Sequence, residues 1–240
     1  MLPPYSTLIR LTWRQYIGHF DVVLYGHILI SLPLVLAATY VKGWFPLPAD
    51  ATTLTELWPN FWIQLGVDQV FGLLGSIVGI MIVLSLQHEP VLPVKFSALC
   101  RQALPLYLPL ILLNTLELIA TAIGLSLFIV PGVLVAVSLT FATPAFIWHR
   151  FSIRKAIRYS WQLVRGQFLL VLFYVLMAQL LISGVILLVT WSLPTTFYFN
   201  VFASWISMMT ASFYLVFVTV MMSATETLAQ MIPQESSDKK

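Results

Sequence analysis

A carboxyl group within a long apolar stretch is the residue of this sequence best suited to chemistry. Glu117 lies near the middle of an apolar run, where a charged side chain is costly and usually has a function. Asn114 and Thr121 share a helical face with Glu117, because residues three and four apart are neighbours on a helix. Gln179 lies at a comparable depth in another apolar run. These four residues form a candidate polar site, which either handles a proton or a cargo or is only a neutral, hydrogen-bonded contact between helices.

The remaining reactive side chains do not converge. Three of the four histidines lie at the ends of apolar runs, and we interpret the fourth, His27, as a helix-packing residue. The single cysteine, Cys100, excludes an intrachain disulfide. No nucleophile motif, glycine-rich phosphate loop or pair of carboxylates is visible. The sequence therefore predicts no catalytic residue, no metal and no cofactor, and it favours a protein that is not an enzyme.

The composition of this chain is typical of a protein that folds within a membrane. Of its 240 residues 60% are hydrophobic and 9% are charged, and its mean hydropathy is +0.93. Soluble domains carry about 25% charged residues. Because a soluble core of this length cannot hide so much apolar surface, we expect most of it to face lipid or other membrane helices. The predicted fold class is an all-α integral membrane protein.

Six apolar runs are long enough to cross a bilayer, which takes about 20 residues each. The predicted spans are about 21–41, 61–86, 104–130, 132–148, 168–191 and 197–229. The first run is too long for the core of a signal peptide, so we expect it to be retained. We predict one membrane domain over 1–230 and a disordered polar tail over 231–240.

The positions of the basic residues predict the orientation. With the N-terminus inside, of the 12 Lys and Arg only Lys42 falls outside. The others lie inside: Arg10, Arg14, Lys95, Arg101, Arg150, Arg154, Lys155, Arg158, Arg165, Lys239 and Lys240. The positive-inside rule therefore predicts that both termini are cytoplasmic. We expect Glu226, at the inner end of the sixth span, to be solvated.

Two local patterns suggest how the spans meet. Gly72, Gly75, Ser76 and Gly79 give the second span a face of small residues, and such faces let two helix backbones approach closely. Pro131 and Gly132 separate the third and fourth apolar runs. We predict a tight turn at this dipeptide.

A basic amphipathic helix is predicted from Ser152 to Arg165. Ser152 is a suitable N-cap residue and Gly166 a suitable stop. One face carries the apolar residues Ile153, Ile157, Trp161 and Val164, and another carries the basic residues Arg154, Lys155, Arg158 and Arg165. This pattern is typical of a helix that lies in the membrane interface. The basic residues either bind anionic lipid headgroups or serve only as an anchor for orientation.

A weak internal repeat links this helix to the N-terminus. Thr12-Trp13 followed by Gly18-His19-Phe20 matches Ser160-Trp161 followed by Gly166-Gln167-Phe168 at the same spacing. The region 96–101 is a degenerate third candidate. The pattern suggests a cytoplasmic surface helix followed by a membrane hairpin, three times over.

The same region resembles a known family. The matching residues are Pro131-Gly132, Pro144, Ala156, Ser160, Leu163 and Gly166. They resemble the motif of YciC-like bacterial inner-membrane proteins and of the membrane domain attached to some bacterial glycerophosphoryl diester phosphodiesterases. Many members have an acidic residue after the proline-containing span, where this chain has Trp148-His149-Arg150.

The resemblance covers about 40 residues well, and it implies a bacterial inner-membrane location and a role in envelope or lipid homeostasis. The 240 residues hold no counterpart of the soluble phosphodiesterase barrel, so its activity is not implied.

Three hypotheses follow for the function. A non-enzymatic scaffold or accessory protein, which the sequence favours, predicts packed helices without a polar cavity. A transporter or lipid-handling protein predicts a cavity that reaches Glu117. A membrane-embedded enzyme predicts polar groups converging at one interface. The expected partners are the bilayer, anionic lipid headgroups and other membrane proteins, and no nucleic acid is expected.

Overall fold

The structure is a computed structural model that describes residues 2–45, 54–87, 96–191 and 197–231. Within these ranges every regular element is a helix. In chain order they are α1 (Tyr5–Gly18), α2 (Phe20–Gly26), the π-helical turn η1 (His27–Ser31), α3 (Leu32–Gly43), α4 (Leu54–Ser85), α5 (Phe96–Leu127), α6 (Ile129–Leu139), α7 (Ala142–His149), α8 (Ile153–Arg165), α9 (Phe168–Trp191) and α10 (Phe197–Met231). The predicted disordered tail lies outside the described residues beyond Met231.

Six helical segments are long and apolar enough to cross a membrane, which confirms the predicted fold class. They are Phe20–Gly43, Gly66–Ser85, Phe96–Leu127, Ile129–His149, Phe168–Leu188 and Val201–Leu228. The chain is therefore a multi-pass membrane protein. The third segment begins well before the predicted residue 104, because α5 continues through Pro105 and Pro109 without a break.

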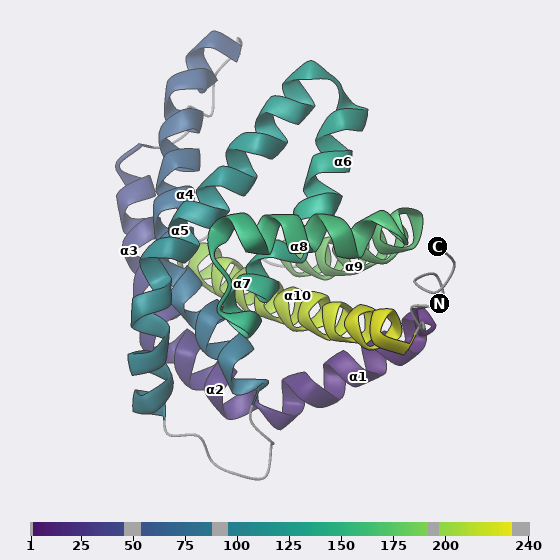
Figure 1. Ribbon diagram of the computed structural model, residues 1–240. Coiled ribbons are helices and arrows are strands. Elements are labelled where there is room, and N and C mark those ends of the chain that lie inside the picture. The colour runs from purple at the N-terminus through teal and green to yellow at the C-terminus, as the bar shows by residue number, and fades with distance from the viewer. Residues whose placement is uncertain (1, 46–53, 88–95, 192–196, 232–240) are drawn as a thin grey trace, which may run out of the picture.

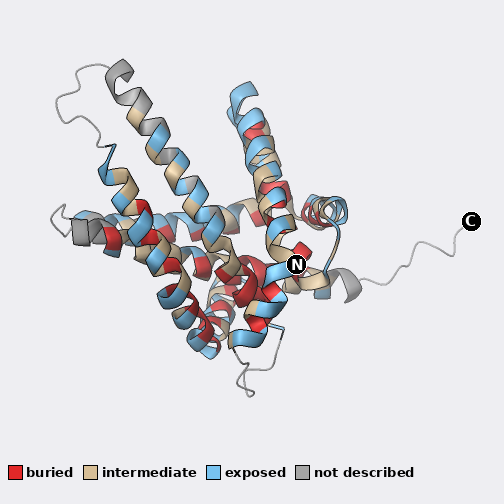
Figure 2. Cartoon of the chain, turned by 90° about the vertical axis from the view of Figure 1, so that its left-hand side faces the viewer, coloured by how far each residue is buried: buried red, intermediate tan, exposed pale blue. Residues whose placement is uncertain are grey.

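The helices form hairpins that project from a shared centre. Figure 1 shows α5 and α6 meeting at one tip and diverging below it, and α1 running beside α10. Buried residues gather where the helices meet, and exposed residues cover the projecting arms (Figure 2). Because the arms are apolar, this exposed surface is suited to lipid.

The turn between α5 and α6 lies at Phe128 and not at the predicted Pro131-Gly132. Phe128 has an extended backbone (φ −164°, ψ 156°), and α6 begins at the next residue. Pro131 is tolerated in the first helical turn because its missing N–H would have no partner there. Gly132 instead permits close packing, since a Cβ atom built on Gly124 would lie 2.8 Å from the Cα atom of Gly132.

The fourth span is divided into α6 and α7. Pro144 has no N–H to donate to the carbonyl group one turn earlier, and the helix breaks at Thr140 and Phe141. Ser160 of α8 fills the break: its hydroxyl oxygen accepts the N–H of Phe141 at 3.1 Å and its O–H donates to the carbonyl oxygen of Ser138 at 2.6 Å. Helix α8, which is separate from the candidate spans, thus completes the hydrogen bonding at the break in one of them.

The two candidate repeat helices bury their residues in the same register. In α1 the buried residues are Leu8, Thr12 and Tyr16, and in α8 they are Ala156, Ser160 and Val164. Trp13 and Trp161, which follow the central buried residue in each helix, are 58% and 51% exposed. The proposed third copy differs, because residues 96–101 form the first turns of α5 and not a separate surface helix.

Candidate functional site

A pocket of about 370 Å³ lies beside Glu117 among α5, α6, α7 and α10. Its polar lining comes from three helices and the α6–α7 break: Asn114, Glu117 and Thr121 of α5, Thr140 at the break, Thr143 of α7 and Tyr214 of α10. The structure therefore places three of the four predicted site residues on one pocket. No Lys or Arg is among its described lining residues.

Thr143 connects the two principal polar groups of α5. Its hydroxyl oxygen lies 3.0 Å from Oδ1 of Asn114 and 3.4 Å from Oε1 of Glu117. Because a threonine has a single O–H to donate, the shorter contact is the stronger hydrogen bond. The Glu117 carboxyl group retains hydrogen-bonding capacity toward the pocket.

Gln179, the fourth predicted residue, reaches the same group through Tyr214. A side-chain hydrogen bond joins Tyr214 to Gln179, and Glu117 lies close enough to Tyr214 to act on it electrostatically. Gln179 itself does not line the pocket. Sequence reasoning missed Thr143 and Tyr214, because nothing local shows that α7 and α10 face α5 at this level.

The packing of the α5–α6 hairpin explains why space remains here. The glycine contact between Gly124 and Gly132 holds the two helices together near the tip. Below it they diverge (Figure 1), and the break at Thr140 redirects the chain into α7. The polar face of α5 therefore borders an open volume.

The basic helix α8 forms a separate element, and its most deeply buried side includes one residue of the predicted apolar face, Val164. Its inward side is Ala156, Ser160 and Val164, whereas the predicted apolar residues Ile157 and Trp161 line an outer groove of about 590 Å³ with Arg154, Arg158 and Arg165. Of the predicted apolar face, Val164 is buried, Ile153 and Ile157 pack partly against the core, and Trp161 is 51% exposed. Ser152 is the N-cap residue by position, but its side chain makes no capping hydrogen bond.

Lys155 is set apart from the three arginines of that groove. Its Nζ atom lies 4.1 Å from the centre of the Phe151 ring, a distance typical of a cation–π contact. The four basic residues predicted to contact the interface are all exposed, but they do not form one surface.

The small-residue face of α4 packs tightly at one end only. A Cβ atom built on Gly79 would lie 3.0 Å from Cδ2 of Leu215, one built on Gly75 would lie 3.9 Å from Cε of Met208, and one built on Gly72 would meet nothing within 4 Å. The predicted packing role therefore fits Gly79 and not Gly72, because α4 and α10 separate along this face.

A second polar cluster was not foreseen. Glu226 accepts a hydrogen bond from the Tyr159 hydroxyl at 2.6 Å, and its Oε1 atom lies 2.8 Å from Nε2 of His149. The prediction that Glu226 is solvated was therefore wrong, because its carboxyl group has two side-chain partners. Burial raises the pKa of Tyr159 above its ordinary value, and the hydrogen bond and the charge of Glu226 raise it further. The sequence offered one indication of this cluster: His149 and Glu226 both lie near the ends of predicted spans, on the same predicted side of the membrane.

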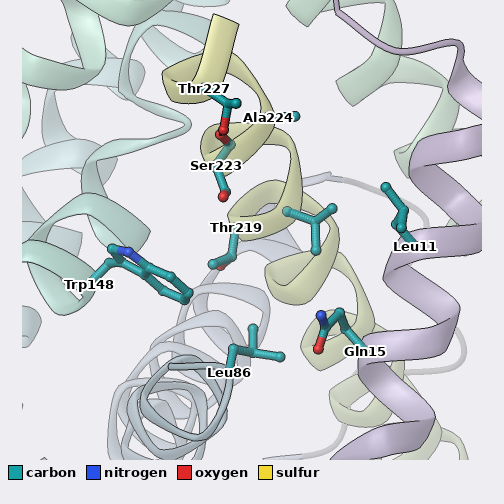
Figure 3. Close-up of a pocket in the computed structure, with 9 residues that line it drawn as sticks. Leu11, Gln15, Leu86, Trp148, Thr219, Ser223, Ala224 and Thr227 are labelled. Carbon is teal, nitrogen blue, oxygen red and sulfur yellow. The ribbon is translucent and has the colours of Figure 1, made fainter. Parts of the chain in front are cut away.

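Another pocket, of about 240 Å³, lies between α1, α7 and α10. Figure 3 shows Trp148 on one side, Leu11 on the other, and Thr219 and Ser223 between them. The Thr219 and Thr227 hydroxyls already donate to carbonyl oxygens within α10.

Among the described residues no group of three or more His, Cys, Asp or Glu side chains could hold a metal ion. Comparison with models of known families, with curated proteins and with solved structures found no match for the chain. The site must therefore be interpreted from its own geometry.

Proposed function

We propose that this chain is a lipid-handling protein of the bacterial inner membrane, which binds the polar end of a lipid at the Glu117 pocket. The observation that carries the proposal is the pocket itself, about 370 Å³ in volume and lined by a carboxyl, an amide and several hydroxyl groups. A scaffold without a cavity, which the sequence favoured, does not require such a space. The pocket supports the lipid-handling alternative.

The mouth of the pocket suggests that its ligand arrives from the bilayer. Leu118, which is 52% exposed, and Ala136, which is also exposed, are part of the lining. Apolar residues at a rim within a membrane span border lipid and not water. A ligand with an apolar tail can therefore place its head at Glu117 while the tail stays among lipid chains.

The chemistry of the lining limits the head of that lipid. Without a Lys or Arg in the described lining, a buried anionic group would have no counter-charge, and an unpaired buried charge is costly. Carboxyl, amide and hydroxyl groups instead suit a hydroxyl or amine head. We infer that the ligand is an uncharged lipid with a hydroxyl head, such as a diacylglycerol.

This role is one of binding and not of a reaction. No Cys, His or Lys is among the described residues that line the pocket, so the usual nucleophiles and bases do not adjoin Glu117. The outer groove of α8 contributes separately: Arg154, Arg158 and Arg165 would hold anionic headgroups of the cytoplasmic leaflet. With both termini inside, α8 lies on that side.

The family resemblance supports the location more than the chemistry. Its motif residues Ala156 and Ser160 are fully buried, and Gly132 makes a close helix contact. Ser160 joins α8 to the end of α6, and Gly132 builds the contact between α5 and α6. We therefore propose membership of the YciC-like family, with a role in lipid or envelope homeostasis, because the residues of the shared motif have structural roles in this chain.

Photocrosslinking in lipid nanodiscs tests the proposal. A diazirine analogue of diacylglycerol should label peptides of α5, α7 and α10, and a phosphatidylglycerol analogue, which carries an anionic phosphate, should label them less. Glu117→Gln should keep labelling because the amide retains a donor and an acceptor. Glu117→Leu and Thr143→Val should reduce it by about tenfold, if each removes one well-formed hydrogen bond.

Matched variants separate binding from folding. Thr115→Val removes a hydroxyl from the same helix outside the pocket and should have no effect on labelling. Ala136→Trp fills the rim without touching Glu117 and should abolish labelling while the melting temperature is kept. Equal labelling of the wild type, Glu117→Leu and Ala136→Trp would overturn the proposal.

A further inference from the structure

The outer groove of α8 carries three arginines in a single row. Arg154, Arg158 and Arg165 line this groove of about 590 Å³. With 3.6 residues per turn, the three positions fall within about 40° of one another around the helix axis, and the row extends roughly 16 Å along it. They lie on the half of the helix opposite Ser160, the centre of its buried side. The row therefore faces outward.

These arginines have no acidic partner among the described residues. All three are exposed, and the ion pairs within the described part of the chain join Lys42 to Asp68 and His149 to Glu226. Between Glu117 and Glu226 the sequence contains no acidic residue. The groove therefore presents positive charge that the neighbouring chain does not neutralise, and its complement is an anionic ligand.

The uncharged residues of the groove lie beside this row. Gln162 and Trp161 fall between Arg158 and Arg165 along the axis, on opposite sides of the row. Gln162 is exposed, and its amide group has no hydrogen-bond partner among the described residues. Trp161, which is 51% exposed, forms an apolar flank with Ile157. Along the groove the order is thus a pair of arginines, an amide and a third arginine.

We propose that this groove binds a lipid with two phosphates joined by a glycerol bridge, of the cardiolipin class, in preference to a lipid with one phosphate. Arg154 and Arg158, one helical turn apart, hold the first phosphate, and Arg165, about 10 Å further along, holds the second. The amide of Gln162 lies between them and bonds the free hydroxyl of the bridging glycerol. The acyl chains lie along the apolar flank at Trp161.

A single phosphate satisfies only part of this arrangement. If the pair Arg154 and Arg158 holds it, Arg165 and Gln162 are left without a partner on the same lipid. A second phosphate on the same molecule binds as an intramolecular event, which raises the overall affinity beyond that of either contact alone. The preference for two phosphates therefore follows from the spacing of the arginines and not from their total charge.

The inference rests on the proposed function only in placing α8 at the cytoplasmic leaflet. It does not depend on the Glu117 pocket, which lies among α5, α6, α7 and α10. That pocket takes an uncharged head, whereas the groove takes an anionic one. Glu117→Leu should therefore reduce diacylglycerol labelling and leave cardiolipin binding unchanged, so that failure of one assignment is distinguishable from failure of the other.

Native mass spectrometry of the whole protein in detergent micelles, titrated with cardiolipin and with phosphatidylglycerol, tests the groove. The wild type should bind cardiolipin about tenfold more tightly than phosphatidylglycerol. Arg165→Gln should lower the cardiolipin affinity about fivefold, the effect of one basic group near an anionic surface, and change the phosphatidylglycerol affinity by less than about twofold. The ratio of the two affinities should therefore fall.

Gln162 tests the glycerol bridge. Gln162→Leu should weaken cardiolipin binding about fivefold, if it removes one hydrogen bond. It should have no effect on an analogue whose bridging glycerol lacks the free hydroxyl. Lys155→Gln is the matched control, because Lys155 is a basic residue of the same helix that lies over the Phe151 ring outside the groove, and this variant should keep the wild-type ratio of affinities.

Equal affinity of the wild type for the two lipids would overturn the assignment, and so would equal losses of cardiolipin binding in Arg165→Gln and Lys155→Gln. Displacement of bound cardiolipin by millimolar inorganic pyrophosphate would assign the groove to a soluble diphosphate and not to a lipid. Melting temperatures of the variants should match the wild type, because all the replaced side chains are exposed.

Discussion

The hydroxyl group of Ser160 donates a hydrogen bond to the carbonyl oxygen of Ser138 at 2.6 Å, across the break between α6 and α7. The hydroxyl oxygen of Ser160 also accepts the N–H of Phe141 at 3.1 Å. One fully buried side chain of α8 thus satisfies two backbone groups at the break in a proline-containing helix. In lipid these groups have no water to replace the lost partner.

Ser160→Ala should therefore destabilise the protein. Two buried backbone groups lose their partner, and each such loss costs about 1–3 kcal/mol in general, although membrane measurements average nearer 0.6 kcal/mol. We expect a loss of about 1–3 kcal/mol in unfolding free energy, measured by denaturation in mixed micelles. Ser152→Ala is the control, because Ser152 makes no capping hydrogen bond; equal losses in both variants would contradict this role.

The Tyr159–Glu226 hydrogen bond predicts a response to alkaline pH. Burial first, and then Glu226, raise the pKa of Tyr159 in the folded protein above the unfolded value of about 10. The neutral phenol therefore stabilises the fold fully below about pH 10 and loses this contribution as the pH rises through the folded pKa. Tyr159→Phe should lower stability at pH 7 and flatten the decline above pH 10.

Melting temperatures between pH 7 and pH 11 measure this effect. Burial also raises the pKa of Tyr16 to about 12, so the variant should retain part of the alkaline decline. His19→Gln, which leaves the Glu226 cluster unchanged, should follow the wild-type curve. A Tyr159→Phe protein as stable as the wild type at pH 7, with the same alkaline decline, would show that the hydrogen bond contributes nothing.

Hydropathy predicted the six spans because a segment that crosses lipid must consist mainly of apolar residues over about 20 positions. The contacts between spans were harder to predict, because lipid-facing and buried residues are equally apolar. Glu117, Asn114 and Thr121 could be grouped because they share one helix face. Thr143 and Tyr214 could not, since only long-range packing brings them to Glu117.

The same difficulty explains the corrected features. Pro131-Gly132 has the composition of a turn, but the close contact of Gly132 with Gly124 uses the glycine for helix packing. The apolar stripe of α8 was predicted to lie in the membrane interface, and it did not indicate which side chains contact the protein. The buried face contains Ser160, which hydrogen-bonds at the break between α6 and α7, and Pro144 marks the position of that break only approximately.

The predicted orientation, with both termini inside, can be tested with single cysteines. Cys100 is only partly exposed, with its sulfur 3.7 Å from that of Met81, so it should first be replaced by alanine. Gly43→Cys lies beside Lys42, which pairs with Asp68, and should react with an impermeant maleimide in intact spheroplasts. Ser152→Cys, before α8, should react only after permeabilisation. The reverse pattern would invert the topology.

The outer groove of α8 should give the protein a preference for anionic lipid that Lys155 does not share. Arg154, Arg158 and Arg165 line this groove beside Trp161, whereas Lys155 lies over the Phe151 ring. Each basic group near an anionic leaflet contributes about 1 kcal/mol, so replacing the three arginines with glutamine should remove about 3 kcal/mol at low salt.

Retention of phosphatidylglycerol and cardiolipin by the purified protein, followed by native mass spectrometry, measures this preference. The triple variant should lose these lipids, and the wild type should lose them as ionic strength rises, because screening weakens exposed charge contacts. Lys155→Gln should retain them almost as well as the wild type. If the triple variant and Lys155→Gln retained equal amounts at low salt, the groove would be excluded as the headgroup contact, and α8 would serve only the helix junction held by Ser160.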